Sequence, residues 1–225
     1  MNGASERSPL RSAAIAAAVL ALFALVGSGL VGLGYELTRE RIAANERAAL
    51  LRSLHAVLDP AEYDNDLLQD YTLARDPVLL GSEEPIRVYR ARREGEPVAA
   101  LLTPVAPDGY NGPIRLIVGV YRDGTVAGVR VLSHSETPGL GDAIEAERSD
   151  WIRGFSGRSL GDPEPERWAV RRDGGVFDQF TGATVTPRAV VTAVRNTLEY
   201  FGEHRRELFT APPVGLEGEE ERGDD

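Results

Sequence analysis

The ten residues 178–187 read DQFTGATVTP, and they place a compact turn directly in front of a predicted helix. Thr186 is a good helix N-cap, and Pro187 suits the first helical position, where its missing N–H costs nothing. The following residues form one stripe at helical spacing: Val190, Ala193, Val194, Thr197, Leu198 and Phe201. A helix start of this kind presents free backbone N–H groups and the positive end of the helix dipole, which suit a phosphate. The sequence therefore predicts a strand-like run at 175–177, a turn and a long amphipathic helix.

Within this stretch, residues 178–184 resemble the flavinylation motif Asp-x-x-(Ser/Thr)-Gly-Ala-Thr of proteins that carry FMN covalently. In that family the last threonine of the motif holds FMN through a phosphoester bond, after transfer from FAD by a dedicated flavin transferase. The matching position is Thr184, so the resemblance implies covalent FMN at Thr184. The other motif residues would shape the attachment turn, and the first of them is also a candidate to assist the transferase: Asp178, Thr181, Gly182 and Ala183. The alternative is that the threonines only shape a strand-to-helix turn.

A long hydrophobic segment lies near the N-terminus. Residues 13–35 contain no charged side chain, and a helix of that length is long enough to cross the hydrocarbon core of a bilayer. A cleaved signal peptide is the rival interpretation, but its apolar region is usually shorter. The run continues into the charged, helix-favouring stretch 36–58, which favours a retained anchor followed by a juxtamembrane helix.

Flanking charge leaves the orientation of this segment open. Two arginines precede it and four follow it closely: Arg7 and Arg11, then Arg39, Arg41, Arg47 and Arg52. Counted literally, the positive-inside rule leans towards a cytoplasmic C-terminal domain. Large domains cross membranes largely regardless of such charges, so the count decides little.

Composition excludes several classes of function. The chain has no cysteine, which removes disulfides, iron–sulfur clusters and thiolate zinc sites. Its three histidines are too scattered to predict a metal site. The net charge of −10 argues against nucleic-acid binding. Residues 212–225 hold six acidic residues and one arginine, and we expect this tail to be disordered.

The part between anchor and tail predicts an α+β fold. Alternating or apolar runs predict strands at 86–92, 97–105, 114–121, 125–133 and 168–171, with Asp-Gly or Glu-Gly turns between several of them. A short helix is expected at 144–152. Successive hairpins followed by an amphipathic helix indicate an antiparallel sheet with packed helices. The predicted organisation is a short segment 1–12, an anchor 13–35, a juxtamembrane helix 36–58, one domain 59–211 and the tail 212–225.

A second candidate site is the loop 134–142, which reads HSETPGLGD. It offers backbone amides, hydroxyl groups and a carboxylate that could bind the polar edge of an isoalloxazine ring, with Leu140 against the apolar face. On residue chemistry alone, the simpler interpretation is a surface loop that caps the following helix through Asp142.

Several segments together resemble the G subunit of the Rnf (Rsx) ion-translocating electron-transport complex. They are the loop just described, APDGYNGPI at 106–114, DWIRGF at 150–155 and RWAVRRDGGVFDQFTGAT at 167–184, and the resemblance covers about residues 10–205. It implies an FMN-carrying electron relay with no general acid or base of its own. The loop residues that would contact the flavin ring are Glu136, Thr137, Pro138, Gly139, Leu140 and Gly141.

The same resemblance implies a location and partners. The chain would span the bacterial inner membrane once, with its main domain in the periplasm, against the literal arginine count. Expected partners are the other Rnf subunits, notably the membrane and FMN-carrying ones, a periplasmic flavin transferase and membrane lipid. Two rival functions remain: the C subunit of the sodium-pumping NADH:quinone reductase, and a membrane-anchored ligand-binding module without redox turnover.

Overall fold

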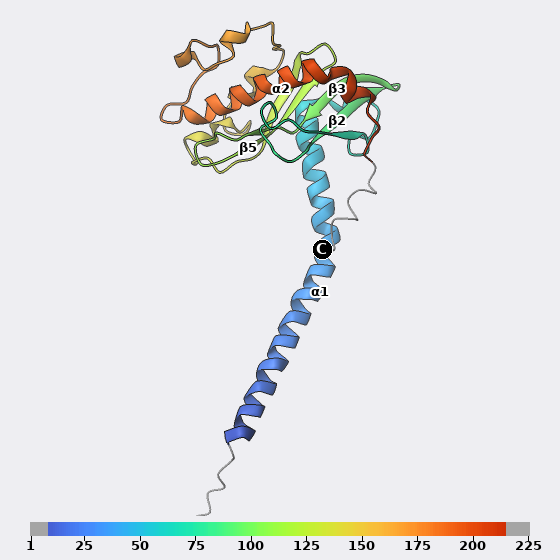
Figure 1. The fold of residues 1–225 in the computed structure, drawn as a ribbon, viewed down its shortest axis with the longest axis vertical. Helices are drawn as coiled ribbons and strands as arrows, with labels where there is room; N and C mark the ends of the chain where they lie inside the picture. Colours follow the sequence, from blue (N-terminus) through green and yellow to red (C-terminus); the bar gives the residue numbers. More distant parts are fainter. Residues whose placement is uncertain (1–8, 215–225) are drawn as a thin grey trace, which may run out of the picture. The chain divides into compact units, whose positions relative to one another are not determined.

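The computed structural model describes residues 9–214, and the chain divides into two compact units, Met1–Leu50 and Leu51–Asp225. Helix α1, Pro9–Val57, contains the whole predicted anchor and nearly all of the predicted juxtamembrane helix (Figure 1). An 18-residue stretch of α1 has a mean hydropathy of 2.5, and none of this stretch is buried within the protein. By length and composition, α1 therefore includes a candidate membrane span. Of the predicted disordered tail 212–225, residues 215–225 lie outside the described residues, and within 212–214 the Val214 N–H donates to the Tyr71 carbonyl at 2.9 Å.

The second unit, as far as residue 214, is built on a six-stranded antiparallel sheet. Its strands are β1 (Tyr71–Ala74), β2 (Ile86–Arg93), β3 (Glu96–Leu102), β4 (Val105–Ala106), β5 (Ile114–Tyr121) and β6 (Val126–Ser133). The order is β1-β2-β3-β5, with β4 continuing beside β5 where β3 ends, and β6 also pairs with β5. The predicted α+β fold with an antiparallel sheet is confirmed.

Four of the predicted strands are confirmed as β2, β3, β5 and β6. The predicted strand 97–105 is shorter than expected, because β3 ends at Leu102 and Pro104 has no N–H to donate to a ladder. The chain then resumes as β4 against the start of β5. The short strands β1 and β4 were not predicted from the sequence.

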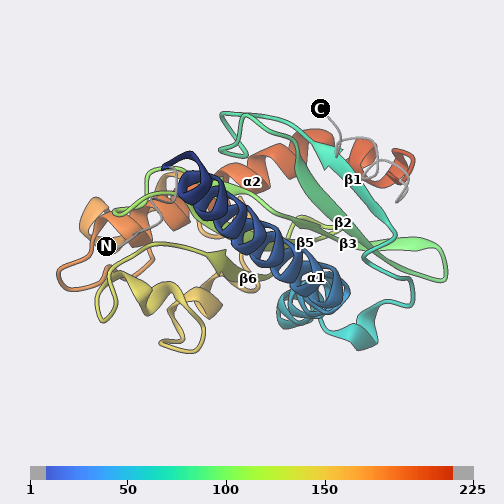
Figure 2. The ribbon, with the colours of Figure 1, turned by 90° about the horizontal axis from the view of Figure 1, so that it is seen from below.

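Helix α2, Val185–Thr210, covers one face of the sheet, as Figures 1 and 2 both show. It contacts β3, β4 and β5, and its predicted stripe is buried. The predicted N-cap is wrong by two residues: Thr184 occupies the N-cap position, and Thr186 lies inside the first turn. The Thr186 hydroxyl is instead used in a contact with a distant loop. Pro187 still falls within the first turn, where helix N–H groups have no partner in the helix.

The last turn of α1 packs within the second unit. Leu54, Val57 and Leu58 are each at most 5 % exposed. A side chain on Gly119 would bring its Cβ within 2.4 Å of the Val57 side chain, and one on Gly128 within 2.8 Å of the Val57 carbonyl oxygen. These two glycines face each other on β5 and β6, so they leave the space that Val57 occupies.

A buried ionic cluster holds the C-terminal end of α2. The Arg90 side chain is 1 % exposed and its Nε donates to Asp70 at 2.6 Å, while Arg92 donates to the other Asp70 oxygen at 2.7 Å. Arg90 also donates to the carbonyl of Ala211, and Arg92 to that of Phe209 at 2.7 Å. Two cations therefore meet the unpaired carbonyls at the negative end of the helix dipole.

Two predicted elements are wrong. Residues 144–152 do not form one helix; two 3₁₀ helices, Gly141–Ile144 and Trp151–Phe155, flank a turn in which Ser149 donates to the Ala143 carbonyl at 2.6 Å. Residues 168–171 do not form a strand and make only a single bridge, Val170 to Phe177. Trp168 stacks in a buried aromatic cluster with Phe155, so packing of aromatic rings determines the backbone there.

Candidate functional site

One buried side chain, that of Glu136, connects the two candidate sites predicted from the sequence, which are the 134–142 loop and the attachment turn at the start of α2. Glu136 is 4 % exposed, and its carboxylate accepts a hydrogen bond from the Thr186 hydroxyl in the first turn of α2. The same carboxylate accepts a second hydrogen bond from the Asn111 backbone N–H at 3.1 Å. The loop after β6, the first turn of α2 and the 106–113 loop are therefore joined at one point, although they are far apart in the sequence.

Two glycines let the backbone approach this carboxylate closely. A Cβ on Gly141 would lie 2.8 Å from a Glu136 oxygen and 3.1 Å from the Thr186 hydroxyl. A Cβ on Gly109 would lie 2.9 Å from the other Glu136 oxygen and 2.2 Å from the Gly112 carbonyl. Any larger residue at either position would push these loops apart, so both glycines are required by packing around Glu136.

The 136–141 loop is a tight turn with an exposed outer surface. The Thr137 carbonyl accepts hydrogen bonds from Leu140 at 3.1 Å and from Gly141 at 3.0 Å, and the Thr137 hydroxyl accepts one from the Asn111 side chain at 3.0 Å. Pro138, Gly139 and Leu140 remain exposed. The interpretation of this loop as a helix cap through Asp142 is wrong, because the following 3₁₀ helix has no side-chain cap.

The attachment motif forms a small exposed turn that ends at the N-terminus of α2. Thr181 and Gly182 are exposed, and Ala183 and Thr184 are half-buried. Gly182 has φ of +83°, the left-handed region that glycine adopts without steric cost. Thr184 is the N-cap residue, yet its side chain makes no capping hydrogen bond. Its hydroxyl is therefore not committed to the helix that it begins.

Leu140 connects the loop to the attachment turn. A Cβ on Gly182 would lie 3.5 Å from Leu140 Cδ2, which is ordinary van der Waals contact. Leu140 is nevertheless 45 % exposed, so it presents an apolar surface beside the turn. The structure thus brings together the loop and the turn that the sequence identified separately.

Asp178 has a different environment from the rest of the motif. Its side chain is exposed and forms an ion pair with Arg171 at 3.1 Å. Its carbonyl accepts a hydrogen bond from the Trp151 indole N–H at 2.7 Å, and Trp151 packs edge-on against Phe180. These contacts support the chain immediately before Thr181, which agrees with a role for Asp178 in shaping the turn.

A surface ion pair connects the preceding loop to α2. Arg188 donates from Nε and from its terminal nitrogen to the two Asp173 oxygens, at 2.7 and 3.0 Å. The hydrogen bond from Arg188 lowers the pKa of Asp173, and the same bond raises the pKa of Arg188. This contact and the roles of Asn111 and Thr186 were missed by sequence reasoning. The 106–114 segment entered the sequence analysis only through its resemblance to the family, which assigned no role to Asn111.

The residues at the start of α2 fit the phosphate end of a flavin mononucleotide. The first N–H groups of an α-helix have no intrahelical acceptor, and the dipole there favours an anion. The turn before them is made of small residues and is open to solvent, so a bulky group could reach the Thr184 hydroxyl. Beside the turn, Leu140 offers an apolar contact for a flat ring.

Comparisons with known proteins identify the family of this chain. The profile of the FMN-binding domain matches residues 109–199, and that of the RnfG N-terminal region matches residues 1–57. The chain is thus an FMN-binding domain joined to an N-terminal hydrophobic helix. It is 50 % identical over 194 residues to the G subunit of the ion-translocating oxidoreductase complex of Vibrio cholerae, covering 86 % of this chain and 92 % of that one. The corresponding protein of Pseudomonas aeruginosa is 51 % identical over 209 residues, covering 93 % and 96 %. The chain belongs to the family formed by the G subunits of ion-translocating oxidoreductase complexes.

Among solved structures, the crystal structure of Shewanella oneidensis NqrC is similar at a TM-score of 0.44 and 23 % sequence identity. The match covers 67 % of this chain and 73 % of that one.

Proposed function

We propose that this chain carries FMN covalently at Thr184 and relays electrons through it within a membrane complex of the Rnf type. The observation that carries the proposal is the convergence of two separate segments on the first turn of α2. Glu136 reaches Thr186, and Leu140 lies beside Gly182. Both ends of a bound FMN then have suitable surroundings: a helix N-terminus for the phosphate and the loop for the ring.

Attachment at Thr184 requires an external enzyme and a hydroxyl that this enzyme can reach. The Thr184 oxygen would form a bond to the phosphorus of the FMN half of FAD, while the P–O–P bond of FAD breaks. AMP leaves and the hydroxyl proton is released. The exposure of Thr181 and Gly182 gives a flavin transferase access to this turn. Gly182 and Ala183 carry the smallest side chains, so they leave space for FAD.

The 136–141 loop would contact the ring from one side. Leu140 would pack against the isoalloxazine, and the half-buried Thr137 and the exposed Pro138 and Gly139 would lie beside it. Glu136 is buried and already accepts two hydrogen bonds, so its role would be to fix the loop from below rather than to touch the ring. Bound FMN supplies the redox chemistry, and the protein orients it and sets its surroundings.

The candidate span in α1 and the membership of the family support a proposal for the location. We propose a single span within α1 in the bacterial inner membrane, with the FMN domain in the periplasm, where it would meet a flavin transferase. Membrane lipid and the other Rnf subunits would be its neighbours. Alkaline phosphatase and green fluorescent protein, each fused after Leu58 and after Phe209, test this arrangement. We expect active phosphatase at both positions, whereas bright green fluorescence would reverse the topology.

A denaturing gel tests covalent attachment against reversible binding. When the chain is produced together with a flavin transferase, its band should fluoresce as flavin under ultraviolet light after boiling in detergent. Without the transferase the band should be dark. A dark band in both cases would leave only non-covalent binding, as in a ligand-binding module.

A further inference from the structure

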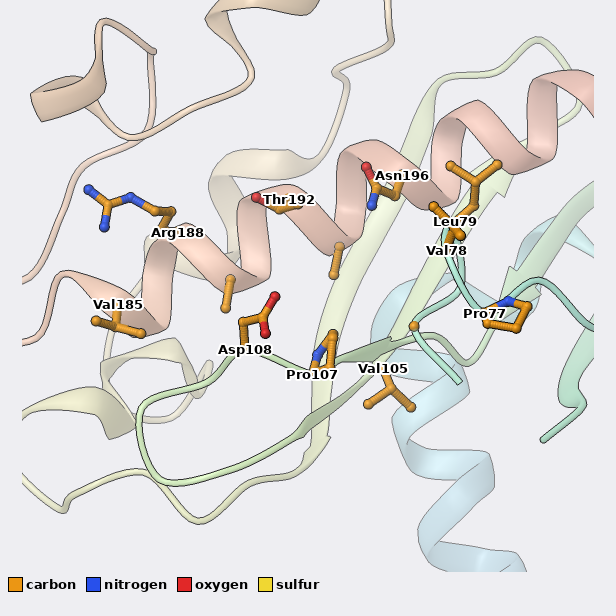
Figure 3. Close-up of a pocket in the computed structure, with 13 residues that line it drawn as sticks. Pro77, Val78, Leu79, Val105, Pro107, Asp108, Val185, Arg188, Thr192 and Asn196 are labelled. Atoms are coloured by element: carbon orange, nitrogen blue, oxygen red, sulfur yellow. The ribbon is translucent and has the colours of Figure 1, made fainter. Parts of the chain in front are cut away.

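A groove runs along one side of α2 and begins at the residue after Thr184. Its volume is about 270 Å³. Helix α2 forms one wall, and the segment after β1 and the segment around β4 form the other (Figure 3). The helix contributes Val185, Arg188, Ala189, Thr192, Ala193 and Asn196. No residue of the 136–141 loop lines the groove, so it is distinct from the surface around Leu140.

The length of the groove suits a molecule tethered at its beginning. Val185 and Asn196 are eleven residues apart on one helix, which corresponds to about 16 Å along the axis. This is similar to the length of an extended FMN molecule from phosphate to ring. Arg188 lies four residues after Thr184 and therefore on the same side of the helix. The Arg188 guanidinium, which binds Asp173, would therefore lie beside a phosphodiester on Thr184, where its positive charge favours the anion.

The lining matches the two halves of an isoalloxazine ring. Val185, Ala189 and Leu79 give apolar walls for the benzenoid part. Thr192 and Asn196 offer a hydroxyl and an amide, which can donate to the ring carbonyls and accept from its N–H. Asp108 points towards α2 across the groove in Figure 3, and it adds an acceptor for the hydroxyl groups of the ribityl chain.

Thr184 is therefore close to two surfaces that could hold the same ring. Leu140 lies beside Gly182 in the attachment turn, and the groove starts at Val185. Val78 on the far wall is 78 % exposed and Val185 is 41 % exposed, so the groove has an uncovered apolar surface as well. The ribityl phosphate is a chain of single bonds and permits either placement.

We propose that this groove is a second binding position for the isoalloxazine ring of the FMN attached at Thr184. The inference rests on the proposed attachment. The ring exchanges between the loop and the groove by rotation about the bonds that link it to Thr184. A carrier that receives electrons in one position and delivers them in another gains access to two partners without movement of its own domain.

The absence of cysteine in the chain allows a direct distance measurement. Glu203 is exposed on α2 beyond the groove, so Glu203→Cys can carry a nitroxide label without blocking the groove. Along the helix axis, position 203 is about 16 Å from Thr192 in the middle of the groove and about 28 Å from Thr184. Pulsed electron paramagnetic resonance then measures the distance from the nitroxide to the flavin in its one-electron-reduced form, using the full chain in detergent.

The expected result is a population near the shorter of these distances in addition to a longer one. Thr192→Trp, which fills the groove from an exposed position, should remove the short population, and the matched Thr192→Ala should keep it. A single, long nitroxide–flavin distance in the parent protein would contradict the second binding position. So would a short population that survives Thr192→Trp. The mass of the flavin-bearing peptide is measured on each sample first, because absence of covalent flavin would instead refute the attachment at Thr184.

Discussion

Glu136 and Thr186 are fifty residues apart in the sequence and share a buried hydrogen bond at the start of α2. Through this bond the loop that follows β6 is fixed to the helix that follows the attachment turn. The Asn111 N–H binds the same carboxylate, so a third segment is held in place by Glu136. Neither Glu136 nor Thr186 needs to touch the flavin for this arrangement to control where the flavin lies.

Removal of the Thr186 hydroxyl should destabilise the domain. Thr186→Val keeps the shape of the side chain but leaves a buried carboxylate oxygen without its donor, which typically costs about 1–3 kcal/mol. Thr186→Ser retains the hydroxyl and should lose much less. Thermal unfolding of the two purified variants measures the difference. Equal midpoints for the valine and serine variants would show that the hydrogen bond contributes little.

Changes on the loop should alter the flavin without preventing its attachment. Leu140→Ala removes an exposed apolar contact and Glu136→Gln removes a charge beneath the loop, while the attachment turn stays intact. We expect normal covalent flavin with a shifted absorption spectrum or midpoint potential. A shift of about 30 mV in the two-electron couple corresponds to about 1.4 kcal/mol. Unchanged spectra and potentials in both variants would mean that the loop does not hold the ring.

Asp70 should be essential for stability because two arginines depend on it. In Asp70→Asn the buried Arg90 loses its counter-charge, and breaking a buried pair in this way costs about 3–5 kcal/mol. Glu83→Gln is a suitable control, since Glu83 is exposed on the same unit. The measurement is the midpoint of chemical denaturation. A loss no larger than that of the control would contradict the assigned role of the cluster.

The last turn of α1 should be required for the FMN-binding domain to fold. A fragment that starts at Leu51 keeps Leu54, Val57 and Leu58, whereas one that starts at Pro60 loses them. Their burial contributes about 5 kcal/mol in total, which is comparable with the whole stability of many domains. We expect cooperative thermal unfolding only for the longer fragment. Similar unfolding midpoints for the two fragments would show that the helix end is dispensable.

Local signals in the sequence were sufficient for the hairpins and for α2. Alternating residues on either side of Glu94 and Gly95 define β2 and β3, and both turn residues adopt the positive φ that such a hairpin needs. The stripe from Val190 to Phe201 fixes the buried face of α2. In these elements the local pattern and the tertiary packing agree, so the pattern is reliable.

Long-range contacts explain what the sequence could not predict. Thr186 is a residue type that is common at helix N-caps, but its hydroxyl donates to Glu136 and the helix is capped two residues earlier, at Thr184. Residues 168–171 have the pattern of a strand, but Trp168 stacks on Phe155 and packs at a tilt against Phe177 in a segment without regular pairing. The contribution of Asn111 also depends on a contact across the fold. Each of these roles is decided by a partner that is remote in sequence.

Peptide mass mapping tests the proposed attachment of FMN at Thr184. Cleavage after arginine releases residues 173–188, which contain Thr181, Thr184 and Thr186 together. With a flavin transferase present, this peptide should gain the mass of FMN minus water, and fragmentation should place the added mass on Thr184. Thr184→Val should abolish the gain and Thr181→Val should leave the attachment residue unchanged. Full labelling of the Thr184→Val protein, or fragment ions that place the flavin on Thr181, would contradict attachment of FMN at Thr184.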